Sequence, residues 1–185
     1  WASGWLSPFY CDNRKTLAYP KVRSFVKDQL AALIREQYPE ATAIAGVATG
    51  AIAQGALVAD ALNLPMCYVR AKAKDHGMGN LIEGTLPEGA KVVVVEDLIS
   101  TGGSSLKAVE ALRAAGFEIL GMVASFTYGF PVAEEAFRAA NVTLTTLTNY
   151  EAVVETARAI GYIEESHLPL LARWRANPST WSPEV

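Results

Sequence analysis

Two adjacent carboxylates, Glu96 and Asp97, follow an apolar run and precede a loop of small and hydroxyl-bearing residues. The run, residues 92–95, consists of four valines, which is typical of a strand that is buried on both faces. Ligands of open α/β sheets bind beyond the carboxyl ends of strands. Paired carboxylates at such an end can accept hydrogen bonds from two vicinal sugar hydroxyls, or bind a divalent cation. The stretch therefore predicts the part of a site that holds a ribose.

The loop after the carboxylates has the composition of an anion-binding turn. It leads into residues 106–115, whose apolar period predicts a helix. Gly102 and Gly103 allow the backbone to approach a ligand, and the N–H groups of a helix start attract an anion. Hydroxyl donors are available from Ser100, Thr101, Ser104 and Ser105. The alternative is an ordinary strand-to-helix corner, but adjacent carboxylates at a strand end are costly without a ligand.

A second informative stretch, RAKAKDHGMGN, covers residues 70–80. It lacks an apolar period and is predicted to be a loop. Its basic or titratable side chains are Arg70, Lys72, Lys74 and His76. A charge run is usually a solvated face. Beside a sugar-phosphate site in a chain with a net charge of −3, we interpret it as a clamp for an anionic substrate.

Two shorter features could add to the same site. Residues 43–48 are predicted to be a buried strand, and Thr49 and Gly50 turn from it into a predicted helix at 52–62. This turn should lie near the carboxylates, although a Thr-Gly pair is equally a tight turn without a ligand. Arg14 either points into the site or is a surface residue paired with Asp12.

The elements that must position these residues predict an α/β fold. Strands are expected at 43–48, 66–69, 81–85, 92–95, 118–126 and 142–147, and helices at 19–38, 52–62, 106–115, 131–140, 150–160 and 164–176. We expect a mostly parallel sheet of about five strands flanked by helices, in a single domain over residues 1–185. The helix at 19–38 is expected to pack against the core through Val22, Phe25, Val26, Leu30, Leu33 and Ile34.

Composition excludes several classes of protein. The chain has 185 residues, of which 51% are hydrophobic and 19% charged. It shows no apolar run of transmembrane length and no signal peptide, so we expect no membrane partner and a cytoplasmic location. Two cysteines without metal-ligand spacing do not suggest a zinc site or a disulfide framework. The net charge does not favour nucleic acid. Whether a segment precedes Trp1 is left open.

Three motifs together resemble a known family. VVVVEDLISTGGSS, residues 92–105, resembles the signature with which type I phosphoribosyltransferases bind PRPP, the activated ribose phosphate. It lacks the lysine of a P-loop. SPFYCDNR, residues 7–14, and KAKDHG, residues 72–77, resemble signatures of the orotate phosphoribosyltransferases, and KAKDHG is the most family-specific of the three. The resemblance covers essentially the whole chain.

This resemblance implies transfer of a phosphoribosyl group from PRPP to orotate, which yields orotidine 5′-monophosphate and pyrophosphate and requires Mg²⁺. It implies catalytic roles for Lys74 and Asp97, and a pyrophosphate-binding turn at Thr49 and Gly50. The residues that it implies for PRPP binding are Arg70, Lys74, His76, Glu96, Asp97, Leu98, Ile99, Ser100, Thr101, Gly102, Gly103 and Ser104. For orotate it implies Ser100, with Arg14 at the carboxylate.

The resemblance also implies a hood over the base, formed by about residues 1–18 with a C-terminal contribution, and a homodimer in which the basic loop reaches the neighbouring site. The chain departs from the family at Ala2, where many relatives have lysine, and at Ala71, where relatives have a second basic residue. An orotate-binding arginine of some relatives is replaced within residues 126–130. Two alternatives therefore stay open: a phosphoribosyltransferase for another base, and a non-catalytic regulator that senses PRPP. No metal ligands are assigned.

Overall fold

The computed structural model describes residues 4–71 and 81–183. The chain falls into two compact units. One unit, residues 13–150, contains the sheet. The other joins the segment before Asn13 to the segment that begins at Glu151. The prediction of one domain with a hood over the base stays a prediction.

The sheet, within the described residues, has six strands in the order β3-β2-β1-β4-β5-β6. All neighbouring strands are parallel except β2 and β3. The strands are β1 (Ala43–Val47), β2 (Met66–Val69), β3 (Ile82–Glu83), β4 (Lys91–Ile99), β5 (Glu118–Thr127) and β6 (Leu144–Asn149). The expected α/β class and mostly parallel sheet are confirmed, and the strand expected at 81–85 is present as the short antiparallel β3.

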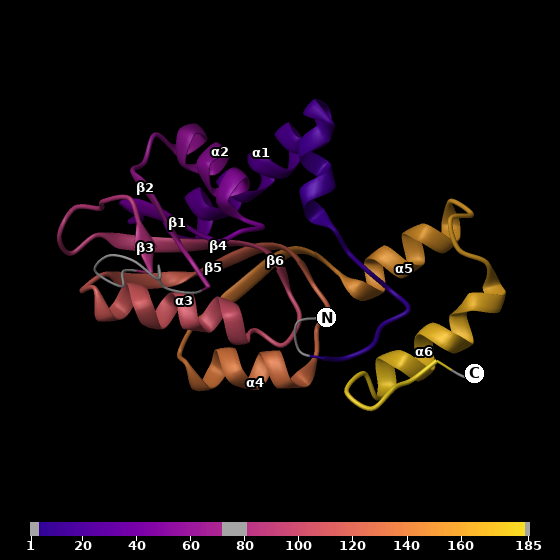
Figure 1. Cartoon of the computed structure of the whole chain (residues 1–185). Coiled ribbons are helices and arrows are strands. Elements are labelled where there is room, and N and C mark those ends of the chain that lie inside the picture. The colour runs from indigo at the N-terminus through magenta and orange to yellow at the C-terminus, as the bar shows by residue number, and fades with distance from the viewer. Residues whose placement is uncertain (1–3, 72–80, 184–185) are drawn as a thin grey trace. The chain divides into compact units, whose positions relative to one another are not determined.

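Helices cover both faces of this sheet (Figure 1). On one face lie α1 (Pro20–Gln37), preceded by the 3₁₀ helix η1 (Asn13–Ala18), and α2 (Ile52–Leu62). On the other face lie α3 (Gly103–Ala114) and α4 (Pro131–Ala139). The chain continues through α5 (Tyr150–Ala159), η2 (Glu165–His167) and α6 (Leu168–Ala176). No described helix is both long and apolar enough to cross a bilayer.

The valine run of β4 lies at the centre of the core. Val92 and Val94 pack on the side of α3 and α4, and Val93 and Val95 pack on the side of α1 and α2. All four valines are fully buried. The expectation of a strand covered on both faces is therefore confirmed, and each buried valine contributes roughly 1.5–3 kcal/mol of hydrophobic free energy. This rigid strand carries the two carboxylates at its far end.

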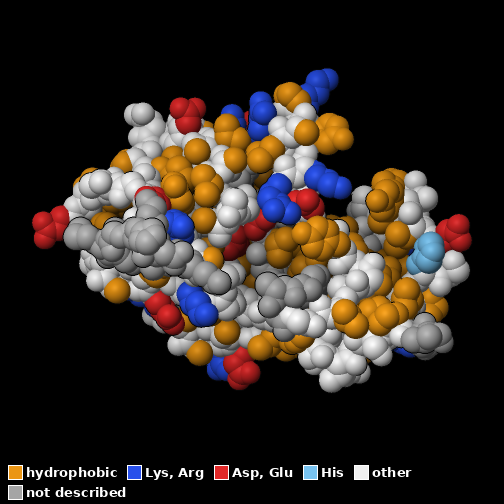
Figure 2. Space-filling model, in the orientation of Figure 1, with side chains coloured by type: hydrophobic (Ala, Val, Ile, Leu, Met, Phe, Trp, Pro, Cys, Tyr) orange, Lys and Arg blue, Asp and Glu red, His pale blue; other side chains and the backbone are white. Residues whose placement is uncertain are grey.

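The start of α1 does not pack as expected. Val22 and Phe25 are 45% and 63% exposed, whereas Leu30, Ala31 and Ile34 are buried. The fully buried residues of α1 lie in its second half, and Val26 packs against the same core while partly buried. Hydrophobic side chains lie exposed among basic ones over α1 at the top of Figure 2. The helical period identified an apolar stripe but not where along the helix it becomes covered.

Candidate functional site

Strands β1 and β4 are parallel neighbours, so their carboxyl ends meet at one edge of the sheet. A cavity of about 210 Å³ opens there. Its lining consists of Val47, Ala48, Thr49, Gly50, Glu96, Asp97, Leu98, Ser100, Gly102, Ser104 and Ser105. The structure therefore brings together the carboxylates, the Thr-Gly turn and the hydroxyl-rich loop, which sequence reasoning assigned to a single site. The Ala48–Thr49 peptide bond is cis.

Strand β4 extends further than the valine run predicted. It pairs with β5 through Leu98 and Ile99, so both carboxylates lie inside the strand and not after it. The Ile99 side chain is fully buried in the core, and only its backbone could reach a substrate. The strand continues because β5 offers it backbone partners as far as Thr127, which local sequence does not reveal.

Asp97 is held at several of its atoms. Its backbone N–H donates to Glu96 Oε1 at 2.9 Å, and its Oδ1 accepts the N–H of Leu98 at 2.8 Å. Its carbonyl oxygen accepts a hydrogen bond from Asn13 Nδ2 at 2.7 Å. Its carboxylate lies directly against Gly50, where a Cβ atom would overlap it. The absence of a side chain at Gly50 therefore creates the space that Asp97 occupies.

Glu96 lies deeper than its neighbour and is 5% exposed. Ser105 Oγ donates to Glu96 Oε2 at 2.8 Å. Burial raises the pKa of Glu96 well above its usual range, and the hydrogen-bonded, negatively charged Asp97 raises it further. Ser105 is 2% exposed. Its hydroxyl thus donates to Glu96, Ser105 also lines the cavity, and the expectation that it is a donor for phosphate stays a prediction.

The start of α3 has the form of an anion cup. Gly102 occupies the N-cap position with φ of +80°, and no side chain caps the helix. The first N–H groups of a helix have no acceptor within it, so they can face an anion. A Cβ at Gly102 would lie 2.8 Å from Phe137 Cε2 of α4. Glycine is therefore required there both for the left-handed backbone and for the packing of α4.

The predicted clamp lies only partly within the described residues. Arg70 follows β2 and forms an ion pair with Glu83 of β3, with an Nη1–Oε1 distance of 3.4 Å. Lys72, Lys74 and His76 lie outside the described residues. Their expected role is therefore not tested.

The segment before α1 contributes through a residue that sequence reasoning missed. Arg14 is exposed in η1 and does not line the cavity. Its neighbour Asn13 makes the bond to the Asp97 carbonyl. The signal that could have identified Asn13 is its position in the family-like motif SPFYCDNR. Its charged neighbour Arg14 was assigned to the site instead.

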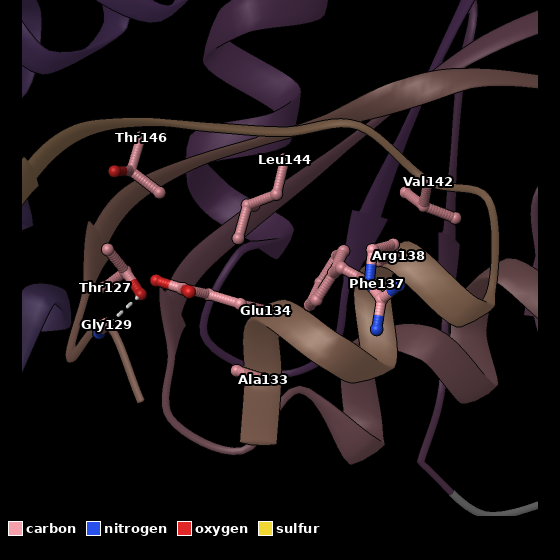
Figure 3. Close-up of a pocket in the computed structure, with 9 residues that line it drawn as sticks. All are labelled: Thr127, Gly129, Ala133, Glu134, Phe137, Arg138, Val142, Leu144 and Thr146. Atoms are coloured by element: carbon pink, nitrogen blue, oxygen red, sulfur yellow. Dashed lines mark hydrogen bonds between the residues drawn. The ribbon is translucent and has the colours of Figure 1, made fainter. Parts of the chain in front are cut away.

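A second cavity, of about 360 Å³, lies between α4 and the strands β5 and β6 (Figure 3). Its walls include Phe137, Val142 and Leu144, and the Glu134 side chain points toward Thr127. Arg138 at its rim pairs with Glu135 and is 81% exposed. This cavity has a single carboxylate and lacks the paired carboxylates and the hydroxyl-rich loop of the smaller cavity, so it suits a sugar phosphate less well.

The unit formed by the two terminal segments has its own packing. Trp174 of α6 is fully buried, and its Nε1 donates to the Leu6 carbonyl at 3.1 Å. A cavity of about 590 Å³ within this unit is lined by Leu6, Ser7, Pro8, Leu170, Arg173, Trp181, Ser182 and Pro183. Arg173 is the one charged side chain in this lining, and the other side chains are mainly apolar or small.

Metal binding by side chains alone has little support in the described part of the chain. No group of three or more His, Cys, Asp or Glu side chains there is arranged to hold an ion. A divalent cation at the strand-end cavity could take its other ligands from water and from a substrate, as Mg²⁺ commonly does beside phosphates.

Known proteins similar to this chain are phosphoribosyltransferases. Residues 22–159 match the family described as the phosphoribosyl transferase domain. The orotate phosphoribosyltransferase of Bacteroides fragilis is 67% identical over 181 residues, which are 98% of this chain and 85% of that protein. The orotate phosphoribosyltransferase of Bacillus subtilis is 55% identical over 97% of this chain and 83% of its own length.

Solved structures agree with the sequence relatives. The crystal structure of orotate phosphoribosyltransferase from Aeropyrum pernix superposes with a TM-score of 0.77 at 30% identity. The match covers 89% of this chain and 90% of that one.

Proposed function

Because the chain belongs to the orotate phosphoribosyltransferases, within the phosphoribosyl transferase domain family, we propose that it transfers the phosphoribosyl group of PRPP to orotate. The products are orotidine 5′-monophosphate and pyrophosphate, in a step of pyrimidine biosynthesis. The observation that carries this proposal is the strand-end cavity, where paired carboxylates, a glycine turn and an uncapped helix start share one space.

The reaction breaks the bond between ribose C1 and the diphosphate and forms a bond from C1 to a nitrogen of orotate. Positive charge develops on the ribose as the diphosphate leaves. Asp97 accepts hydrogen bonds from the ribose hydroxyls, and its negative charge stabilises the developing cation. Glu96 binds the sugar beside it and supports Asp97 through the backbone N–H. The reacting nitrogen of orotate loses its proton as the bond to C1 forms, and that proton passes to the departing diphosphate or to water.

The phosphates of PRPP occupy two parts of the cavity. The 5′-phosphate binds the loop from Leu98 to Ser104 at the start of α3, which fixes C1 relative to the base. The diphosphate binds the backbone of Thr49 and Gly50 and the basic side chains Arg70, Lys74 and His76. Lys74 stabilises the charge on the leaving pyrophosphate. Since Arg70 is paired with Glu83, substrate binding replaces or shares that ion pair.

Mg²⁺ is the metal that fits this site. When bound, it supplies positive charge that offsets the charge of the leaving diphosphate. Asp97 is the side chain that would hold it, and the remaining oxygens would come from PRPP.

Orotate is proposed as the base on the strength of the relatives. Ser100 lines the cavity and can contact the base, and Arg14 is proposed to meet the orotate carboxylate. A phosphoribosyltransferase for another base would share the sugar-phosphate site. Incubation with PRPP, Mg²⁺ and a panel of bases, with pyrophosphate release as the readout, distinguishes the two. Release with a purine or uracil but not with orotate contradicts the proposal.

We further propose that the protein acts in the cytoplasm as a homodimer whose basic loop serves the neighbouring site. Mixed dimers of Lys74→Ala and Asp97→Ala test this arrangement. If the loop crosses between subunits, one of the two sites in a mixed dimer is intact and activity returns on mixing. If each subunit uses its own loop, neither site is intact and no activity returns.

A further inference from the structure

Asn13 connects the start of the sheet-containing unit to the end of its central strand. Its Nδ2 donates to the Asp97 carbonyl at 2.7 Å, across 84 positions of sequence. The bond is partly buried. Asn13 itself belongs to η1 and is not among the residues that line the strand-end cavity. We therefore expect Asn13 to act on a bound substrate through Asp97.

The bonds around Asp97 show what that effect would be. Its N–H is held by Glu96, its Oδ1 by the Leu98 N–H and its carbonyl by Asn13. Oδ2 is the Asp97 oxygen nearest to the position that a Cβ at Gly50 would occupy. Orientation of the carboxylate thus depends on backbone atoms held from both sides. We propose that Asn13 is a positioning residue that fixes the Asp97 carboxylate for the ribose, an inference that rests on the proposed function.

The fold does not require the Asn13 amide to stay in place. The backbone carbonyl of Asn13 accepts a separate hydrogen bond from Thr16 Oγ1 at 2.6 Å, which stabilises η1. Strand β4 remains paired with β5 at Leu98 and Ile99. Loss of the amide therefore frees the Asp97 peptide without releasing the helix or the strand. A displacement of about 1 Å at a substrate-positioning group can cost a factor on the order of 10².

The test is the affinity for PRPP, measured by calorimetry in a double-mutant cycle. Asn13→Ala removes the donor, and Asn13→Asp removes it at nearly constant size, so one variant serves if the other does not fold. Both are measured in the wild-type and the Asp97→Ala backgrounds, where phosphate contacts still support binding. Lys15→Ala is the matched control, because Lys15 is exposed in the same 3₁₀ helix.

We expect loss of the Asn13 donor to weaken PRPP binding about tenfold in the wild-type background and less than about twofold in the Asp97→Ala background. Lys15→Ala should bind like the wild type. Equal weakening in both backgrounds, or unchanged affinity in the wild-type background, would overturn the positioning role alone. A wild-type protein that does not bind PRPP would instead overturn the proposed function, so the two failures are distinguishable.

Discussion

The two strand-to-helix turns that form the cavity differ in what they contribute: one provides space through a missing side chain, and the other provides a charged side chain. The turn after β1 supplies Gly50, whose lack of a side chain leaves room for a carboxylate. The end of β4 supplies that carboxylate, and behind it the buried pair of Glu96 and Ser105. Neither turn would make a sugar-phosphate site alone. The site therefore depends on the fit between Gly50, which has no side chain, at the end of one strand and the charged Asp97 at the end of its neighbour.

Removal of the Asp97 carboxylate should have the largest effect on the reaction rate. Asp97→Ala deletes the carboxylate that we place at the ribose, and we expect kcat/KM for PRPP to fall by about 10²–10³. The matched control is Glu134→Gln, which removes the carboxylate of the cavity beside α4. Steady-state rates for the two variants decide between the cavities. A comparable loss in Glu134→Gln would contradict the choice of the strand-end cavity.

Placing a side chain at Gly50 should have the next largest effect on the reaction rate. Gly50→Ala places a methyl group where the Asp97 carboxylate lies, so we expect kcat/KM for PRPP to fall by about tenfold or more. Gly121→Ala makes a useful contrast, because its Cβ would overlap the Tyr38 hydroxyl on the α1 side of the sheet. It should cost about 1–3 kcal/mol of unfolding free energy while PRPP affinity of the folded protein is kept.

Loss of the support behind the carboxylates should have a smaller effect on the reaction. Ser105→Ala removes the hydroxyl that donates to Glu96 and leaves a buried carboxylate oxygen without that partner. We expect a cost of about 1–3 kcal/mol in unfolding free energy and a fall in kcat/KM of about fivefold. Denaturant unfolding and PRPP-dependent rates measure the two. If Ser105→Ala equalled Asp97→Ala in its effect on rate, Ser105 would have to contact the substrate itself.

The buried Glu96 side chain should also affect how the unfolding free energy depends on pH. The raised pKa of Glu96 means that the folded protein binds this proton more tightly than the unfolded chain. Stability from this group is therefore fully present below its unfolded pKa and is lost as the pH rises through its folded pKa. Glu96→Gln cannot ionise, so its unfolding free energy should decline less than that of the wild type between about pH 5 and pH 8.

Urea unfolding at the two pH values provides this measurement, with Glu88→Gln as the control at an exposed carboxylate. We expect the decline in unfolding free energy to be steeper in the wild type than in Glu96→Gln. An identical decline in Glu96→Gln and the wild type would show that Glu96 is ionised without cost in the folded protein.

Much of the fold could be predicted because its signals are local. The valine run, the glycines and the helical periods indicated the alternation of strands and helices, and the three motifs indicated the family, which the relatives confirm. The exposure of Val22 and Phe25 could not be predicted, because a helical period does not report where a helix meets the sheet.

The site was predictable in its members but not in its contacts. The carboxylates, Thr49–Gly50 and the loop were assigned together and lie together. The bonds from Asn13 to Asp97 and from Ser105 to Glu96 depend on tertiary geometry, which brings η1 and the start of α3 to the end of β4. Neither residue carries a charge that would single it out in the sequence.

The most direct test of the account is pyrophosphate release from PRPP in the presence of Mg²⁺ by the wild type and Asp97→Ala, each with orotate, uracil and adenine. We expect release with orotate by the wild type, little release with the other bases, and a loss of about 10²–10³ in Asp97→Ala. Orotate-dependent release that is undiminished in Asp97→Ala would contradict the central claim that this carboxylate holds the ribose.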